Sequence, residues 1–344
     1  MGESPPAPGG VATPERAVLL RAIAAILAIS AVSLLFIASY AGALHEPRAH
    51  EVPLAVTAQV PAQIAQQLAS SQATRVRTVA DRAAALREID ERKVYGAVVA
   101  TSRGVDLVVA PAAGPAVASA LEQSLVPQLE RAGAKVRTVE VHTLPAGDAR
   151  GLVGFYTAVG WVVAGYLGAA FLGIIFGTRP GRLHTVWRLG GIAVLGLIAG
   201  FGGAVLAAAI GDFEAAFSIG LIGALTIVSV GAVTVALQSA FGIVGTGVAI
   251  LIFVVLGNPA SGGPFPGVLL PGLWRVVGEL IPTGAATTAI RNLAYFPDAS
   301  IAGPLIVLLA WLAAGAGVAL GLGQRRGPLT TEEAQGTAAG VVPP

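Results

Sequence analysis

Residues 215–257 of the chain are AAFSIGLIGALTIVSVGAVTVALQSAFGIVGTGVAILIFVVLG, and this stretch contains no charged residue. Three further stretches, Leu152–Thr178, Leu189–Gly211 and Ile301–Gln324, are also free of charge. An ionisable side chain at the centre of a bilayer costs about 2.5–3.5 kcal/mol on insertion scales, whereas a helix of a soluble protein keeps one polar face. The four stretches are apolar on every face and therefore predict an α-helical polytopic membrane protein.

The composition supports this class and excludes several kinds of chemistry. The chain is 55% hydrophobic and 12% charged, with a mean hydropathy of +0.77, far from the average of soluble domains. It has no cysteine, which excludes disulfides, thiolate metal sites and thiol catalysis. No G-x-x-x-x-G-K-[ST] phosphate-binding loop and no nucleophile–base arrangement occurs. We therefore expect no catalytic residue, no cofactor and no nucleic-acid partner.

Six transmembrane spans are predicted from the length of the apolar runs, since about 20 helical residues cross the hydrocarbon core. Their bounds are 17–44, 152–176, 189–210, 216–237, 241–257 and 301–322. The fifth span is short for a crossing, and Gln238-Ser239 is predicted to be the turn before it. A cleaved signal peptide is the alternative for the first span, because Arg16 and Arg21 resemble its basic region. The long apolar run favours a retained anchor.

The orientation follows from the arginines that flank these spans, which fall on one side of the predicted membrane. They are Arg16, Arg21, Arg179, Arg182, Arg188, Arg325 and Arg326. The short turn on the other side carries Asp212 and Glu214 and no positive charge. By the positive-inside rule, both termini are expected in the cytoplasm. The Pro- and Gly-rich segments 1–16 and 323–344 are expected to be disordered cytoplasmic ends.

Residues 45–151 are polar and periodic, unlike the rest, and predict an extracytoplasmic α+β domain inserted between the first two spans. Alternation of apolar and polar residues indicates strands, expected at 52–60, 75–79, 94–101, 105–110 and 135–141. Helices are expected at 62–70, 82–92 and 115–132, with Asp81 as the N-cap of the second. His45-Glu46 and His50-Glu51 fit a juxtamembrane linker better than a metal site, so no metal is expected.

Two loops carry the candidate functional residues. The cytoplasmic loop 178–188 is interpreted as a docking element for a cytoplasmic partner, or as residues that only set topology and the aromatic belt. Its candidates are Arg179, Arg182, His184, Trp187 and Arg188. The external loop 258–300 predicts two short helices broken by proline, forming either a gate or an interfacial plug over the bundle. Its candidates are Asn258, Pro259, Pro271, Trp274, Pro282 and Arg291. Arg275 and Glu279 are expected to pair at i,i+4.

Glycine and alanine recur at four-residue spacing in several of the predicted spans. The pairs are Ala164/Gly168, Gly173/Gly177, Gly196/Gly200 and Gly317/Gly321. Small residues at this spacing let helices approach closely, which favours packing within one bundle, with a dimer face as the alternative.

The order of elements and several loop residues resemble the ABC-2-type permeases, especially the branch grouped with YhgE and phage-infection-protein (Pip) membrane proteins. The resemblance covers residues 17–322 and is carried by short motifs. They are Val94-Tyr95-Gly96-Ala97, Asn258-Pro259, Gly262-Gly263, Leu270-Pro271, Trp274, Pro282, Gly284, Arg291-Asn292 and Tyr295-Phe296. ABC-2 permeases commonly begin with an amphipathic interfacial helix, which Gly2–Pro14 cannot form.

The resemblance implies an export permease in which two subunits pair and a separate ATPase docks from the cytoplasm. The loop 178–188 would then couple to the ATPase, and the helices of 271–293 would gate the external mouth. The uncharged spans suit a hydrophobic or amphipathic substrate. The alternative is a membrane-anchored receptor or scaffold that transports nothing, whose external domain binds cell-envelope partners or phage.

Overall fold

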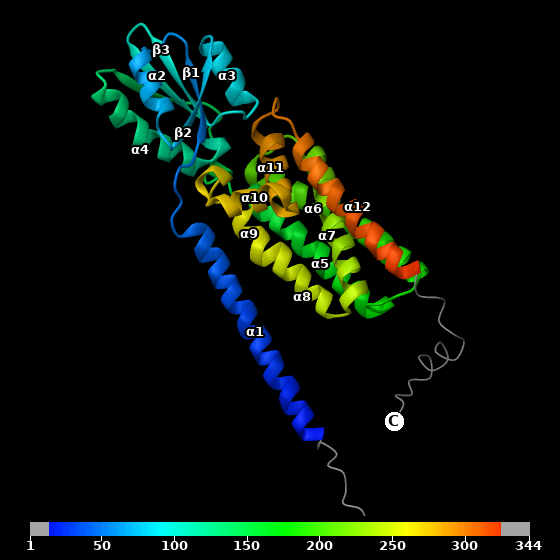
Figure 1. Ribbon diagram of the computed structural model, residues 1–344. Coiled ribbons are helices and arrows are strands. Elements are labelled where there is room, and N and C mark those ends of the chain that lie inside the picture. Colours follow the sequence, from blue (N-terminus) through cyan, green and yellow to red (C-terminus); the bar gives the residue numbers. More distant parts are fainter. Residues whose placement is uncertain (1–13, 325–344) are drawn as a thin grey trace, which may run out of the picture.

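The computed structural model describes residues 14–324, in which three parts follow one another (Figure 1). A long helix, α1 (Pro14–Leu44), comes first. A mixed α/β unit follows between residues 52 and 140, and helices form most of the remainder. The end segments predicted to be disordered lie almost entirely outside the described residues.

Within the described residues, five helices are long and apolar enough to cross a membrane. They are α1 from Arg16, α5 (Val153–Phe176), α6 (Arg182–Gly211), α7 (Ala216–Phe241) and α12 (Ala302–Gln324). The chain expected to form the fifth of six spans is helical but shorter, Val244–Ala260. It consists of α8 (Val244–Ile250), a π-helical segment (Leu251–Leu256) and α9 (Gly257–Ala260). These apolar helices indicate a helical protein suited to insertion in a membrane.

Helix α7 lies at the centre of the bundle, and α5, α6, α11 (Pro282–Tyr295) and α12 pack around it. Of its most apolar 18-residue stretch, 78% is buried. Several of its buried hydroxyls are hydrogen-bonded to backbone carbonyls. Thr226 Oγ1 donates to its own helix at the carbonyl of Ile222, 2.7 Å away. Ser229 Oγ reaches the carbonyl of Leu308 on α12 at 2.8 Å. The central helix is thus uncharged and internally hydrogen-bonded.

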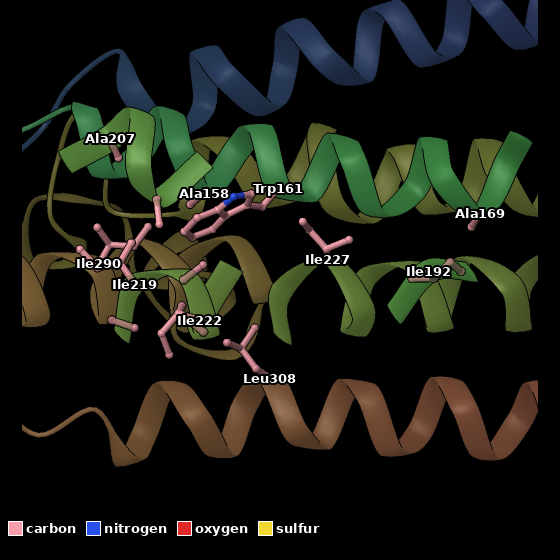
Figure 2. Close-up of a cluster of buried hydrophobic side chains, with 14 of the residues drawn as sticks. Ala158, Trp161, Ala169, Ile192, Ala207, Ile219, Ile222, Ile227, Ile290 and Leu308 are labelled. Carbon is pink, nitrogen blue, oxygen red and sulfur yellow. The ribbon is translucent and has the colours of Figure 1, made fainter. Parts of the chain in front are cut away.

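Trp161 of α5 fills the space between the helices that surround α7. Figure 2 shows it in one cluster of buried side chains with Ile222 of α7, Ile290 of α11 and Leu308 of α12. The indole is 2% exposed, and its Nε1 donates to the carbonyl of Ala199 on α6 at 3.1 Å. Buried tryptophan usually needs such a partner for its N–H.

Two of the predicted boundaries are wrong, and one contact explains both. Helix α6 begins at Arg182, inside the loop expected at 178–188, and α7 continues through the turn expected at Gln238-Ser239 to Phe241. Arg188 and Gln238 are both fully buried and are hydrogen-bonded to each other. Arg188 also donates to the carbonyl of Ala169 at 3.0 Å. The chain turns instead at Gly242, whose φ of 65° favours glycine.

Helix α1 stands apart from the bundle along most of its length (Figure 1). Only 6% of its most apolar 18-residue stretch is buried. Its C-terminal end makes the contacts. Ser39 Oγ donates to the carbonyl of Val255 in the π-helical segment, and Ala43 is 1% exposed. Residues 16–38 of the helix are exposed.

The α/β unit has a five-stranded sheet of order β2-β1-β3-β4-β5. The strands are β1 (Val52–Thr57), β2 (Thr74–Val79), β3 (Gly96–Thr101), β4 (Gly104–Val109) and β5 (Val136–Glu140). Only the β3–β4 hairpin is antiparallel, and the other neighbours are parallel. Its helices are α2 (Ala62–Ala69), α3 (Arg82–Asp90) and α4 (Pro115–Arg131). The expected strands and helices are all present, and Asp81 accepts the N-cap bond from Ala84 at 2.8 Å.

Each face of this sheet buries an apolar cluster that the unit does not complete alone. On one face, residues of α2 and α4 pack with Leu269, which belongs to the segment after α9. On the other face, residues of α3 pack with Phe296, which follows α11 and is fully buried. The unit predicted to span 45–151 therefore takes part of its core from 258–300.

A buried carboxylate ties β4 to two other elements of the unit. Asp106 is 2% exposed and accepts from Arg137 Nη2 at 2.7 Å and from Arg82 Nη1 at 2.8 Å. The hydrogen bond from Arg137, and then the one from Arg82, hold the pKa of Asp106 below its usual value despite its burial.

We predict that Gly200→Ala destabilises the protein by roughly 1–3 kcal/mol through overpacking. A Cβ on Gly200 of α6 would lie 2.4 Å from the amide nitrogen of Ala224 on α7. Gly317→Ala is the matched control, because a Cβ there meets nothing within 4 Å. Thermal unfolding in detergent should show a lower midpoint for Gly200→Ala only. Equal midpoints for the two variants would contradict the close packing of α6 on α7.

Candidate functional site

The segment 258–300 lies between the sheet and the bundle and contacts both (Figure 1). It contains α9, α10 (Gly272–Leu280) and α11. Helix α10 has no buried residue and exposes Leu273, Val276 and Leu280 by more than half. Helix α11 is the opposite, since its side chains are mostly buried. Pro282 is the first residue of α11, as expected, whereas Pro271 lies one position earlier than expected, as the N-cap of α10.

The six residues predicted to form a gate do not come together at one place. Asn258 and Pro259 lie in α9, and Trp274 of α10 faces Gly42 of α1. Pro282 is buried at the start of α11, and Arg291 is buried near its end. The expected Arg275–Glu279 pair is not formed. Arg275 Nε instead donates to the carbonyl of Gly267 at 3.2 Å.

Arg291 is 6% exposed and is held by backbone carbonyls, not by a carboxylate. Its Nη1 donates to Gly262 at 3.1 Å and its Nη2 to Gly263 at 3.3 Å. Glycine is required at both positions. Gly262 has a φ of 74°, and a Cβ on Gly263 would lie 2.3 Å from the ring of Phe155. The Gly262-Gly263 motif therefore brings two acceptors to one buried guanidinium.

A second arginine approaches the same place from the α/β unit. Arg92 follows α3 with a φ of 52° and donates to the side chain of Asn292, next to Arg291. Its guanidinium also lies 5.6 Å from the centre of the Phe296 ring. Burial lowers the pKa of Arg92, and burial followed by the nearby Arg92 charge lowers that of Arg291 to about 10. No sequence motif pointed to Arg92.

The two arginines line a cavity of about 220 Å³ between the sheet and the bundle. Polar groups in its wall include Tyr95, Arg275 and Thr288. One carboxylate, that of the exposed residue Glu279, also lines the cavity. Within residues 14–324, none of Arg92, Arg275 and Arg291 forms an ion pair.

Asp148 and Tyr295 make a separate contact in the same joint. Asp148 is 4% exposed and accepts from the amide of Leu152 at 2.8 Å and from that of Val153 at 3.0 Å, at the start of α5. Its other oxygen accepts from the Tyr295 hydroxyl at the end of α11. Burial, and then the bond to Asp148, raise the pKa of Tyr295. One carboxylate thus joins α5 to α11.

At the opposite end of the bundle lie the residues predicted to dock a partner. Arg182, His184 and Trp187 occupy the first turns of α6 and are exposed, Trp187 by 62%. Arg179 precedes the helix and donates to the carbonyl of Ala240 at 3.5 Å. Arg188 must be taken out of this set, because its side chain is fully buried.

Among the described residues, no group of three or more His, Cys, Asp or Glu side chains could hold a metal ion. Comparison of the chain with protein-family models, with curated proteins and with solved structures gives no match. The resemblance to ABC-2 permeases therefore enters only as a basis for a proposal.

We predict that Tyr295→Phe lowers the stability by roughly 1–3 kcal/mol, because the buried carboxylate of Asp148 loses a hydrogen bond. The pKa of Tyr295 is raised in the folded state. The Tyr295 hydroxyl therefore makes its full contribution to the free energy of unfolding below about pH 10, and this contribution is lost as the pH rises above that value. Thermal unfolding in detergent from pH 7 to 11 should show the difference from wild type shrinking at the alkaline end. Tyr156→Phe, at an exposed position, should be neutral. A difference that stays constant to pH 11 would contradict the assignment.

Proposed function

We propose that the chain crosses the membrane six times, with Val244–Ala260 as the short fifth crossing and both termini in the cytoplasm. Several features support this topology. The start of α1, the α5–α6 connection and the end of α12 lie toward one end of the molecule (Figure 1). That end carries Arg16, Arg21, Arg179 and Arg182, as the positive-inside rule requires of a cytoplasmic face. The α/β unit at the other end would be extracytoplasmic.

We further propose that the protein is the permease subunit of an ABC-2-like exporter that obtains energy from a separate ATPase. The observation that carries this proposal is the exposed surface of Arg182, His184 and Trp187 at the proposed cytoplasmic end. Buried aromatic and arginine side chains dominate the energy of protein interfaces, and these residues offer both kinds. The described part of the apolar helices beyond α1 holds no carboxylate that could relay protons.

A groove between α5 and α6 supports a hydrophobic or amphipathic substrate. It has a volume of about 650 Å³, within the range of sites for small molecules. Small residues form half of its wall: Gly160, Ala164, Ala199, Gly202, Gly203 and Ala207. Tyr156, Leu206 and Ile210 border it and are more than half exposed, so it opens on the outside of the bundle. Its polar side chains are Tyr156 and Thr157, and the Thr157 hydroxyl already donates to the carbonyl of Val153, so the wall suits an alkyl chain.

A receptor or scaffold without transport is the second candidate, and the cavity beside Arg92 and Arg291 favours it, because ligand binding there needs no ATPase. The two functions differ in whether an ATP-hydrolysing partner exists.

The topology predicts the labelling of single cysteines in this cysteine-free chain. Ser102→Cys lies at the exposed β3–β4 turn, and His184→Cys lies at the exposed start of α6. A membrane-impermeant maleimide should label Ser102→Cys in intact cells and His184→Cys only after the membrane is opened. The reverse pattern would show that the orientation is inverted, and equal labelling of both in intact cells would contradict the crossing.

For the proposed docking surface, we predict that the double variant Arg182→Ala/Trp187→Ala loses at least about tenfold of a co-purifying ATPase subunit, as expected for interface hot spots. The measurement is ATP hydrolysis and mass spectrometry of the protein purified from native membranes. Arg103→Ala, at an exposed turn of the α/β unit, is the control with the same loss of charge. Unchanged recovery of the ATPase would remove the docking assignment, and the absence of any ATPase from wild type would favour the receptor.

A further inference from the structure

The cavity between the sheet and the bundle has an excess of positive charge in its wall, where Arg291 is buried and Arg92 and Arg275 are half-buried. Three guanidinium groups line it, from Arg92, Arg275 and Arg291, against the single carboxylate of exposed Glu279. Desolvating a charge is costly unless a partner of opposite sign compensates it. Within the described residues, the hydrogen-bond partners of these arginines are backbone carbonyls, the amide oxygen of Asn292 and the hydroxyl of Tyr95, which carry no formal charge. The carboxylate of Asp148 acts on Arg291 without forming an ion pair with it.

The arginines retain donors for a further partner. A guanidinium has five N–H groups. Arg291 donates to the carbonyls of Gly262 and Gly263, and Arg92 donates to Asn292 and to Tyr95, so each keeps free N–H groups. Thr288 lines the same cavity, and its hydroxyl has no hydrogen-bond partner within residues 14–324. Unused donors on different sides of one small space favour a ligand with several acceptor oxygens.

We propose that this cavity is a binding site for a phosphate group, held between Arg92 of the α/β unit and Arg291 of α11. At about 220 Å³ it is smaller than sites for drug-sized molecules and suits one acidic group. Arginine is the side chain best matched to phosphate geometry. The tetrahedral group presents oxygens in more directions than a planar carboxylate, as donors from α10, α11 and the turn after α3 require. This inference does not depend on the export function.

The position of the cavity allows two sources for the phosphate. It borders α10, whose polar residues Arg275 and Glu279 line it while Leu273, Val276 and Leu280 are exposed. An amphipathic helix with such an exposed apolar side lies at the level of lipid headgroups when the protein is in a membrane. The ligand is therefore a phospholipid headgroup or a soluble phosphate, and the same arginines would hold either.

The test uses the full-length protein purified in detergent and stripped of lipid. In one arm, inorganic phosphate is titrated against sodium chloride of equal ionic strength, and the unfolding midpoint is followed. In the other arm, the protein is placed in nanodiscs of phosphatidylcholine with or without phosphatidylglycerol, and retained lipid is measured by native mass spectrometry. Stabilisation by inorganic phosphate identifies a site open to soluble phosphate. Retention of phosphatidylglycerol, without an effect of inorganic phosphate, identifies a headgroup site.

Variants connect either result to the cavity. Arg92→Gln should weaken the apparent affinity roughly tenfold or more, because a charge-assisted hydrogen bond is lost. Arg291→Gln should do the same, and Thr288→Val should weaken it a few-fold. Arg103→Gln, exposed and remote from the cavity, is the matched control and should bind like wild type. If Arg291→Gln fails to fold, Arg92→Gln and Thr288→Val still decide the matter. The proposal is overturned if neither arm shows binding, or if Arg92→Gln binds as tightly as wild type.

Discussion

The insertion of Leu269 and Phe296 into opposite faces of the same sheet determines how the two halves of this protein meet. Both residues belong to the segment that connects α9 to α12, yet each completes an apolar cluster of the α/β unit. Because both faces of the sheet pack against this segment, the position of the α/β unit on the bundle is fixed by buried contacts as well as by its chain connections. The meeting of Arg92 with Asn292 and of Tyr295 with Asp148 follows from that position.

Much of the fold could be predicted from the sequence, because its dominant signals are local. The absence of charge identified the apolar helices, and period-two alternation with Asp81 as a cap identified the strands and helices of residues 52–140. The failures occurred where a polar residue was taken as the end of a helix. Arg188 and Gln238 are far apart in the sequence, and each alone indicates a loop. Only their contact in the folded protein makes both compatible with a buried helix.

The candidate site was predictable only in part, for the same reason. Pro271 and Pro282 mark helix starts by backbone geometry, and Gly262-Gly263 marks a sharp loop, so this segment could be recognised. Arg92 could not be. It is one of several arginines near a helix end, and its significance arises from residues about 200 positions away in the chain. The sequence does not show whether a charged side chain is exposed, and lower exposure is what separates Arg92 from the other arginines of the α/β unit.

Helix α1 differs from the other long helices in what surrounds it. From Val18 to Ile37 its large apolar side chains are more than a third exposed, and its contacts with the bundle are made near Ser39 and Ala43. A side chain that meets only fluid acyl chains has no fixed shape to complement, whereas those in α7 meet neighbours at fixed distances. Natural variation along the first part of α1 should therefore preserve the length and hydrophobicity of the helix while leucine, isoleucine, valine and phenylalanine replace one another freely. Helix α7 should accept few such replacements.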